Sequence, residues 1–266
     1  MRQRTLRTLA VCGTALLTVM GCMMRYYQLQ TIFDETGLPV SGSPATWLLT
    51  FLSVLLVLEC VLVSWPLPRC RREKGLFVPN AAALALGLLS GACLLLGGAL
   101  ALEQQLRSGG ASYELALAAA QLAAGVCVLA ASWRRWKNAP GLALVHAVIC
   151  LWMVLVLLLH FKNWSMDPTI LDYCFRLFAL ICGMCASYHI GTFCFDRGGR
   201  RVTVFWCLAG CYFLPVSAIG EALAWKLMAA GVCLWLLGNV WQLLGEPCPA
   251  VQPERAADAD EAAQSE

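Results

Sequence analysis

Residues 45–65 read ATWLLTFLSVLLVLECVLVSW, and among these 21 residues only Glu59 carries a charge. An apolar helix needs about 20 residues to cross the hydrocarbon core of a bilayer. The run is continuously apolar and does not alternate with polar residues, which favours a helix over a strand of a membrane barrel. This stretch therefore predicts a membrane-spanning helix, and with it an integral membrane protein of the all-α class.

Seven further apolar runs lie on either side of residues 45–65. They cover residues 6–24, 79–102, 114–133, 141–161, 170–195, 202–220 and 223–244. Of the 266 residues, 60% are apolar or aromatic and 13% are charged, whereas soluble domains carry about 25% charged residues. We therefore predict one polytopic domain, residues 1–244, built as a bundle of about eight transmembrane helices in contact with lipid. This composition excludes a soluble protein and a nucleic-acid-binding module.

The Lys and Arg residues fall mainly on one of the two sides that eight spans create. With the N-terminus in the cytoplasm, 14 of them face the cytoplasm and four face the other side, as the positive-inside rule requires. Tryptophans near span ends, such as Trp47 and Trp65, suit the headgroup level. We predict that both termini are cytoplasmic and that the membrane is a bacterial plasma membrane. The 15 cysteines, with no pair in an outer loop, suit a reducing setting.

The two ends of the chain differ from the spans. Residues 245–266 carry six acidic residues against a single arginine, and this composition predicts a disordered acidic cytoplasmic tail. Its role is solubilising or, alternatively, to contact a protein partner. At the other end, the basic residues 2–7 and the apolar run after them resemble a secretory signal, with residues 19–22 loosely similar to a lipobox. Because the apolar run continues past Cys22, we interpret it as an uncleaved first span.

Glu59 is the most unusual charge in the chain, because a charge in the middle of a bilayer costs about 2.5 to 3.5 kcal/mol. It precedes Trp65 by six residues, hence lies about 9 Å from the cytoplasmic edge at a rise of 1.5 Å per residue. His146 and His189 are expected at a similar depth in the fifth and sixth spans. We predict that Glu59, His146 and His189 form an inner polar centre for an ion or small solute, with satisfied core histidines as the alternative.

A metal or haem site is a second interpretation of the same region. Cys150 follows His146 by four residues and Cys185 precedes His189 by four. Each cysteine therefore lies one helical turn from a histidine, and the four side chains would make a Cys2His2 metal site if the two helix faces meet. The two histidines alone would instead ligate a haem iron. The candidate metal ligands are His146, Cys150, Cys185 and His189, and the sequence leaves the cofactor unknown.

Polar residues at the other ends of the spans form an outer group. Asp172 and Arg176 are four residues apart in the sixth span, so we predict a pair at the outer rim, with anion recognition as the alternative. Pro215 is expected to interrupt the seventh span and to free a backbone carbonyl, and Glu221 follows in a tight turn. A broken helix beside an acidic group is a feature that transporters use to bind ions or substrates.

Small residues on two spans predict close helix packing. Gly87 and Gly91 form a GxxxG pattern, and Ala116, Ala120 and Ala124 share one helix face. We predict that both faces pack within the bundle, with a contact to a protein partner as the alternative.

Signatures of catalytic families are missing from the sequence. The chain has no HExxH, no phosphate-binding loop, no dinucleotide glycine pattern and no serine elbow, so the sequence favours a protein that is not an enzyme. The leading hypothesis is transporter-like handling of an ion or small solute within the bundle. The alternatives are a metal- or haem-binding membrane protein and a non-catalytic partner or sensor subunit.

Overall fold

A computed structural model describes residues 2–31, 43–68, 70, 76–109, 112–164 and 170–245. All regular elements among these residues are helical, which confirms the predicted all-α class. The helices are α1 (Arg2–Thr31), α2 (Pro44–Ser64), α3 (Ala81–Ser108), α4 (Ser112–Trp136), α5 (Ala143–Trp164), α6 (Ile170–Thr192), α7 (Arg200–Ser217) and α8 (Leu223–Gly245). A short 3-10 turn, Phe193–Phe195, follows α6.

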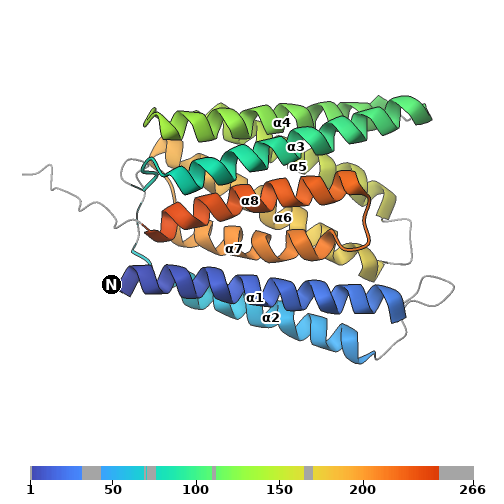
Figure 1. Cartoon of the computed structure of the whole chain (residues 1–266), viewed down its shortest axis with the longest axis horizontal. Helices are drawn as coiled ribbons and strands as arrows, with labels where there is room; N and C mark the ends of the chain where they lie inside the picture. The colour runs from blue at the N-terminus through green and yellow to red at the C-terminus, as the bar shows by residue number, and fades with distance from the viewer. Residues whose placement is uncertain are drawn as a thin grey trace, which may run out of the picture.

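Consecutive helices run in opposite directions, so the bundle has two ends (Figure 1). We call the end at which α1, α3, α5 and α7 begin the proximal end, and the opposite end the distal end. The proximal end is the one that the sequence predicts to face the cytoplasm.

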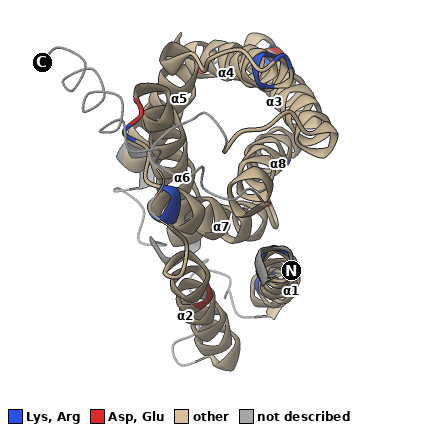
Figure 2. Cartoon of the chain, turned by 90° about the vertical axis from the view of Figure 1, so that its left-hand side faces the viewer, with Lys and Arg blue, Asp and Glu red and all other residues tan. Residues whose placement is uncertain are grey.

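Six of the helices form a closed ring. Each helix from α3 to α8 packs against the next, and α8 packs against α3 to complete the circle (Figure 2). The helices α1 and α2 lie outside this ring, where both pack against α7. One apolar cluster of buried side chains runs through all the helices and fills the core.

Seven of the described helices are long and apolar enough to cross a membrane, which supports a multi-pass membrane protein. The exception is α7, which has 18 residues and begins with Arg200 and Arg201. Thirteen of those 18 residues are buried, because α7 packs against α6 and α8 within the ring and against α1 and α2 outside it. A helix that contacts protein on most of its surface needs less apolar surface than a helix that faces lipid.

The first helix is longer than the sequence predicts, since α1 continues to Thr31 where we expected a span over residues 6–24. The additional turns carry Arg25 and Gln28 into the bundle, where both are buried. Arg25 Nη1 donates to Gln28 Oε1 over 2.7 Å, and Gln28 Nε2 donates to Thr46 Oγ1 of α2 over 3.1 Å. This polar chain joins α1 to α2 at the distal end.

Pro215 does not interrupt α7 in the way that we expected. The helix continues through Pro215 and ends two residues later at Ser217. A proline removes one backbone hydrogen bond, which is most disruptive in the interior of a helix. The bond removed here is the one to the Cys211 carbonyl, which instead accepts from Thr18 Oγ1 of α1 over 3.5 Å and from Cys233 Sγ of α8 over 3.8 Å.

Small residues bring α3 close to both of its neighbours. A Cβ atom added at Gly91 would lie 3.3 Å from the carbonyl oxygen of Gly125 in α4, so the GxxxG pattern packs inside the bundle. On the other side of α3, Ser90 Oγ donates to the Gly231 carbonyl of α8 over 2.6 Å. Of the predicted alanine face of α4, Ala124 is fully buried, whereas Ala116 is exposed.

Candidate functional site

Glu59 contacts α1 and lies apart from the predicted histidine partners. Thr14 Oγ1 of α1 donates to Glu59 Oε1 over 3.3 Å. The other carboxylate oxygen, Oε2, is buried and accepts no hydrogen bond from the described residues. Because α2 lies outside the six-helix ring, this carboxylate belongs to the interface of α1 with α2.

His146 and His189 have different surroundings, although both lie toward the proximal end. His146 is 3% exposed, and its ring stacks on Trp235 of α8 with centroids 5.9 Å apart. Its Nδ1 atom makes no hydrogen bond with the part of the chain that the structure describes. His189 is half-buried, and its ring contacts its neighbour Tyr188. The structure therefore does not bring Glu59, His146 and His189 together as one polar centre.

The predicted metal ligands all lie among the described residues. The thiol of Cys150 points to the Met184 carbonyl oxygen, 3.8 Å from its sulfur atom. Among these residues, no three His, Cys, Asp or Glu side chains gather closely enough to hold a metal ion. His146, Cys150, Cys185 and His189 consequently do not form a four-ligand site in this structure.

At the distal end, Arg176 and Glu221 form an ion pair between α6 and the turn from α7 to α8. The guanidinium of Arg176 also lies 5.4 Å from the centroid of the Trp225 ring. The pairing that we predicted for Arg176 involves Asp172, whose side chain lies outside the described residues. The structure pairs Arg176 with Glu221, which we predicted to lie in a tight turn after the seventh span.

This ion pair lines a cavity of about 280 Å³ inside the distal part of the ring. Five of the six ring helices contribute to its walls. Its polar lining consists of Gln105, Glu114, Gln121, His160, Arg176 and Glu221. Its apolar lining includes Leu117, Ala118, Trp152, Val156, Trp225 and Met228. A volume of about 10 to 15 Å³ suffices for one water, so this cavity has room for a small molecule.

Several polar groups of the cavity are held in place by backbone atoms. Gln121 Nε2 donates to the Leu94 carbonyl over 3.2 Å, which fixes the amide against α3. His160 Nδ1 lies 2.8 Å from the Val156 carbonyl oxygen, and since a carbonyl only accepts, Nδ1 is the donor. The side chains of Gln121 and His160 are therefore held in fixed orientations without a ligand.

Two lining groups have unused hydrogen-bonding capacity. Trp152 is 2% exposed, and its indole N–H finds no acceptor among the described residues. The carboxylate of Glu114, in the first turn of α4, interacts electrostatically with His160 but makes no hydrogen bond or ion pair with the described residues. A buried donor without an acceptor costs about 1 to 3 kcal/mol, a cost that a water in the cavity would offset at Trp152.

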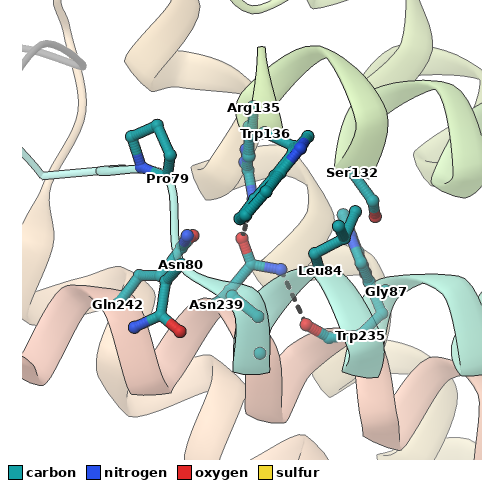
Figure 3. Close-up of a pocket in the computed structure, with 12 residues that line it drawn as sticks. Pro79, Asn80, Leu84, Gly87, Ser132, Arg135, Trp136, Trp235, Asn239 and Gln242 are labelled. Atoms are coloured by element: carbon teal, nitrogen blue, oxygen red, sulfur yellow. Dashed lines mark hydrogen bonds between the residues drawn. The ribbon is translucent and has the colours of Figure 1, made fainter. Parts of the chain in front are cut away.

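Polar contacts join α4 to α8 near the proximal end, as Figure 3 shows. Arg135 Nη1 of α4 donates to Asn239 Oδ1 of α8 over 2.6 Å, and Asn239 Nδ2 donates to the Trp235 carbonyl over 2.7 Å. The guanidinium of Arg135 lies 4.1 Å from the centroid of the Phe77 ring. The pocket beside these groups holds about 20 Å³, which is room for about one water.

Other basic residues at the proximal end bind carbonyl groups at the ends of helices. Arg200 is 1% exposed, and its Nε donates to the Leu243 carbonyl in the last turn of α8 over 2.7 Å. Arg201 Nε donates to the Leu67 carbonyl just after α2 over 2.5 Å. The last carbonyls of a helix lack partners within the helix, so Arg200 stabilises the end of α8, whereas Arg201 joins α7 to the segment that follows α2.

Sequence reasoning missed the distal cavity because its lining comes from segments far apart in the chain. It gave no role to Gln121 or Trp152. One signal was available, since Glu114, His160 and Glu221 all lie near the predicted outer ends of spans. Comparison with protein-family models, with curated proteins and with solved structures gives no match to this chain.

Proposed function

We propose that this chain is a multi-pass membrane protein that binds a small solute in the distal cavity of its six-helix ring, and that it handles this solute in the manner of a transporter. The observation that carries the proposal is the cavity itself, with a volume of about 280 Å³ and walls that are apolar apart from a few oriented polar groups. Sites for small molecules commonly have this character, with volumes of about 300 to 1,000 Å³.

The position of the cavity supports handling within the bundle. It lies inside the ring, and α1 and α2 lie outside it. Trp152 and Met228 line the cavity and are buried. Trp235, two turns past Met228 on α8 toward the proximal end, is also buried. Passage of a solute toward the proximal end therefore requires these side chains to move, as in a site that opens to one side at a time.

The proposed solute site does not include Glu59, His146 or His189, which we predicted from the sequence as the polar centre. Glu59 belongs to the interface of α1 with α2, and His146 stacks on Trp235. Arg176 and Glu221 keep a place in the site, because they form the ion pair that lines the cavity.

A variant that fills the cavity tests the proposal. Ala101 of α3 lines the cavity, whereas Ala99, on the same helix, is exposed and does not. We expect at least one class in a panel of amino acids, amines, organic acids and sugars to raise the unfolding temperature of the wild type in lipid nanodiscs. Ala99→Leu should keep this response, and Ala101→Leu should lose it.

Two results would contradict the proposal. One is a panel in which no solute stabilises the wild type, and the other is a response that persists unchanged in Ala101→Leu. Uptake of the same solute into reconstituted vesicles then separates transport from binding alone.

A further inference from the structure

We infer that the solute is a small amphipathic organic cation, with an ammonium group that binds Glu114 and an apolar part that packs against Leu117 and Val156. This inference rests on the proposed function, because it names the chemical class that the distal cavity binds.

The charges that line the cavity favour a cation. The lining contains two carboxylates, Glu114 and Glu221, and one guanidinium, that of Arg176. Glu221 already pairs with Arg176, so these two charges neutralise each other. The remaining carboxylate, Glu114, interacts electrostatically with His160 but has no hydrogen bond or ion pair among the described residues, and an ammonium group would provide one.

The Trp225 ring of the cavity is already occupied, and the other walls suit an apolar group. Cations bind over the faces of tryptophan rings within about 6 Å of the centroid. The Arg176 guanidinium already occupies such a position over Trp225, 5.4 Å from the ring centroid, and His160 packs against the same ring. The remaining walls, including Leu117 and Val156, are apolar, so they suit a hydrocarbon or aryl group attached to the ammonium.

The volume limits the size of this cation. One water needs about 10 to 15 Å³ of such space, so 280 Å³ accommodates a molecule with up to about 20 non-hydrogen atoms. A primary arylalkyl amine meets these limits, whereas a sugar or a peptide would leave the apolar walls without contacts.

Three probes of nearly equal shape and different charge test the inference. Phenethylamine carries the cation, 2-phenylethanol is neutral, and 3-phenylpropionate carries the anion. Binding is measured by calorimetry on the full chain in nanodiscs of zwitterionic lipid, with empty nanodiscs subtracted. We expect the wild type to bind the amine at least about tenfold more tightly than the alcohol, and the carboxylate most weakly.

Substitutions at Glu114 test whether this carboxylate causes the preference for the amine. Glu114→Gln should lose the advantage of the amine and keep the affinity for the alcohol, and Glu114→Lys should favour the carboxylate. Glu103→Gln is the matched control, since Glu103 is exposed on α3, pairs with Arg107 and does not line the cavity. It should leave all three affinities unchanged, and thermal unfolding confirms that each variant is folded.

The outcomes separate this inference from the proposed function. If the three probes bind equally, or if Glu114→Gln keeps the preference for the amine, the cation inference is wrong while a solute site in the cavity stands. If the carboxylate binds best, the inference is also wrong. If none of the probes binds, the cation inference is wrong. The proposed function is then tested separately, by the solute panel with the wild type and Ala101→Leu.

Discussion

The packing of α3 against α8 makes a sharp prediction about two glycines of α8. A Cβ atom at Gly231 would lie 2.8 Å from Leu94 Cγ and 3.0 Å from the Ser90 carbonyl oxygen, both of α3. A Cβ atom at Gly238, two turns further along α8, would lie 3.5 Å from Leu86 Cβ, which is an ordinary contact. Gly231→Ala therefore forces the two helices apart, and Gly238→Ala does not.

The two variants share every other effect of the substitution. Replacing glycine by alanine in a helix contributes about 1 kcal/mol through backbone propensity, and this contribution cancels when the variants are compared. Overpacking costs about 1 to 3 kcal/mol. At Gly231 it also disturbs the 2.6 Å hydrogen bond from Ser90 Oγ, and such bonds between membrane helices contribute about 0.6 kcal/mol on average. We expect Gly231→Ala to unfold more easily than Gly238→Ala by about 1 to 3 kcal/mol, a factor of about 5 to 150 in the unfolding equilibrium.

Unfolding by SDS in mixed micelles, followed by tryptophan fluorescence and circular dichroism, measures this difference. Gly238→Ala is expected to match or exceed the stability of the wild type. Equal stabilities of the two variants would refute the reasoning, because they would mean that the close approach of α3 to Gly231 does not exist or relaxes without cost.

Two further substitutions test other contacts by the same titration. Glu59→Gln is expected to change the free energy of unfolding by less than about 1 kcal/mol, because an amide oxygen still accepts the hydrogen bond from α1; a much larger loss would show that the negative charge itself is required. Arg200→Met removes the charged donor to the Leu243 carbonyl and is expected to cost about 1.5 to 3 kcal/mol. The exposed Arg197→Met, its control, should cost less than about 0.5 kcal/mol, and equal costs would contradict the role of Arg200.

The helices were predictable because lipid imposes a simple rule on the sequence. A continuous apolar run such as residues 45–65 has to satisfy its own backbone, and a helix does so; α2 begins and ends within one residue of that run. The end of α1 was less predictable. Arg25 looked like the start of a polar connection, but its hydrogen bond to Gln28 lets the helix continue.

The candidate site was less predictable because the depth of a residue in the membrane does not determine which side of its helix the residue lies on. Glu59, His146 and His189 were expected at one depth, but depth leaves open which neighbour each residue faces. A span that is apolar on all sides carries no periodic pattern to supply that direction. The ring order of α3 to α8, which places Glu114 near Arg176, therefore had to come from the three-dimensional structure.

The position of α1 and α2 outside the ring has a consequence for the order of assembly during synthesis. Both helices pack on α7, yet α2 ends at Ser64 and α7 begins at Arg200. At about 5 to 20 residues per second, a ribosome needs on the order of ten seconds to make the chain between them. During that time the hairpin of α1 and α2 lacks its contact with α7, but the Thr14 hydroxyl that binds Glu59 lies within the hairpin itself. The most costly charge of the chain thus has a partner before the helix that anchors the hairpin has been made.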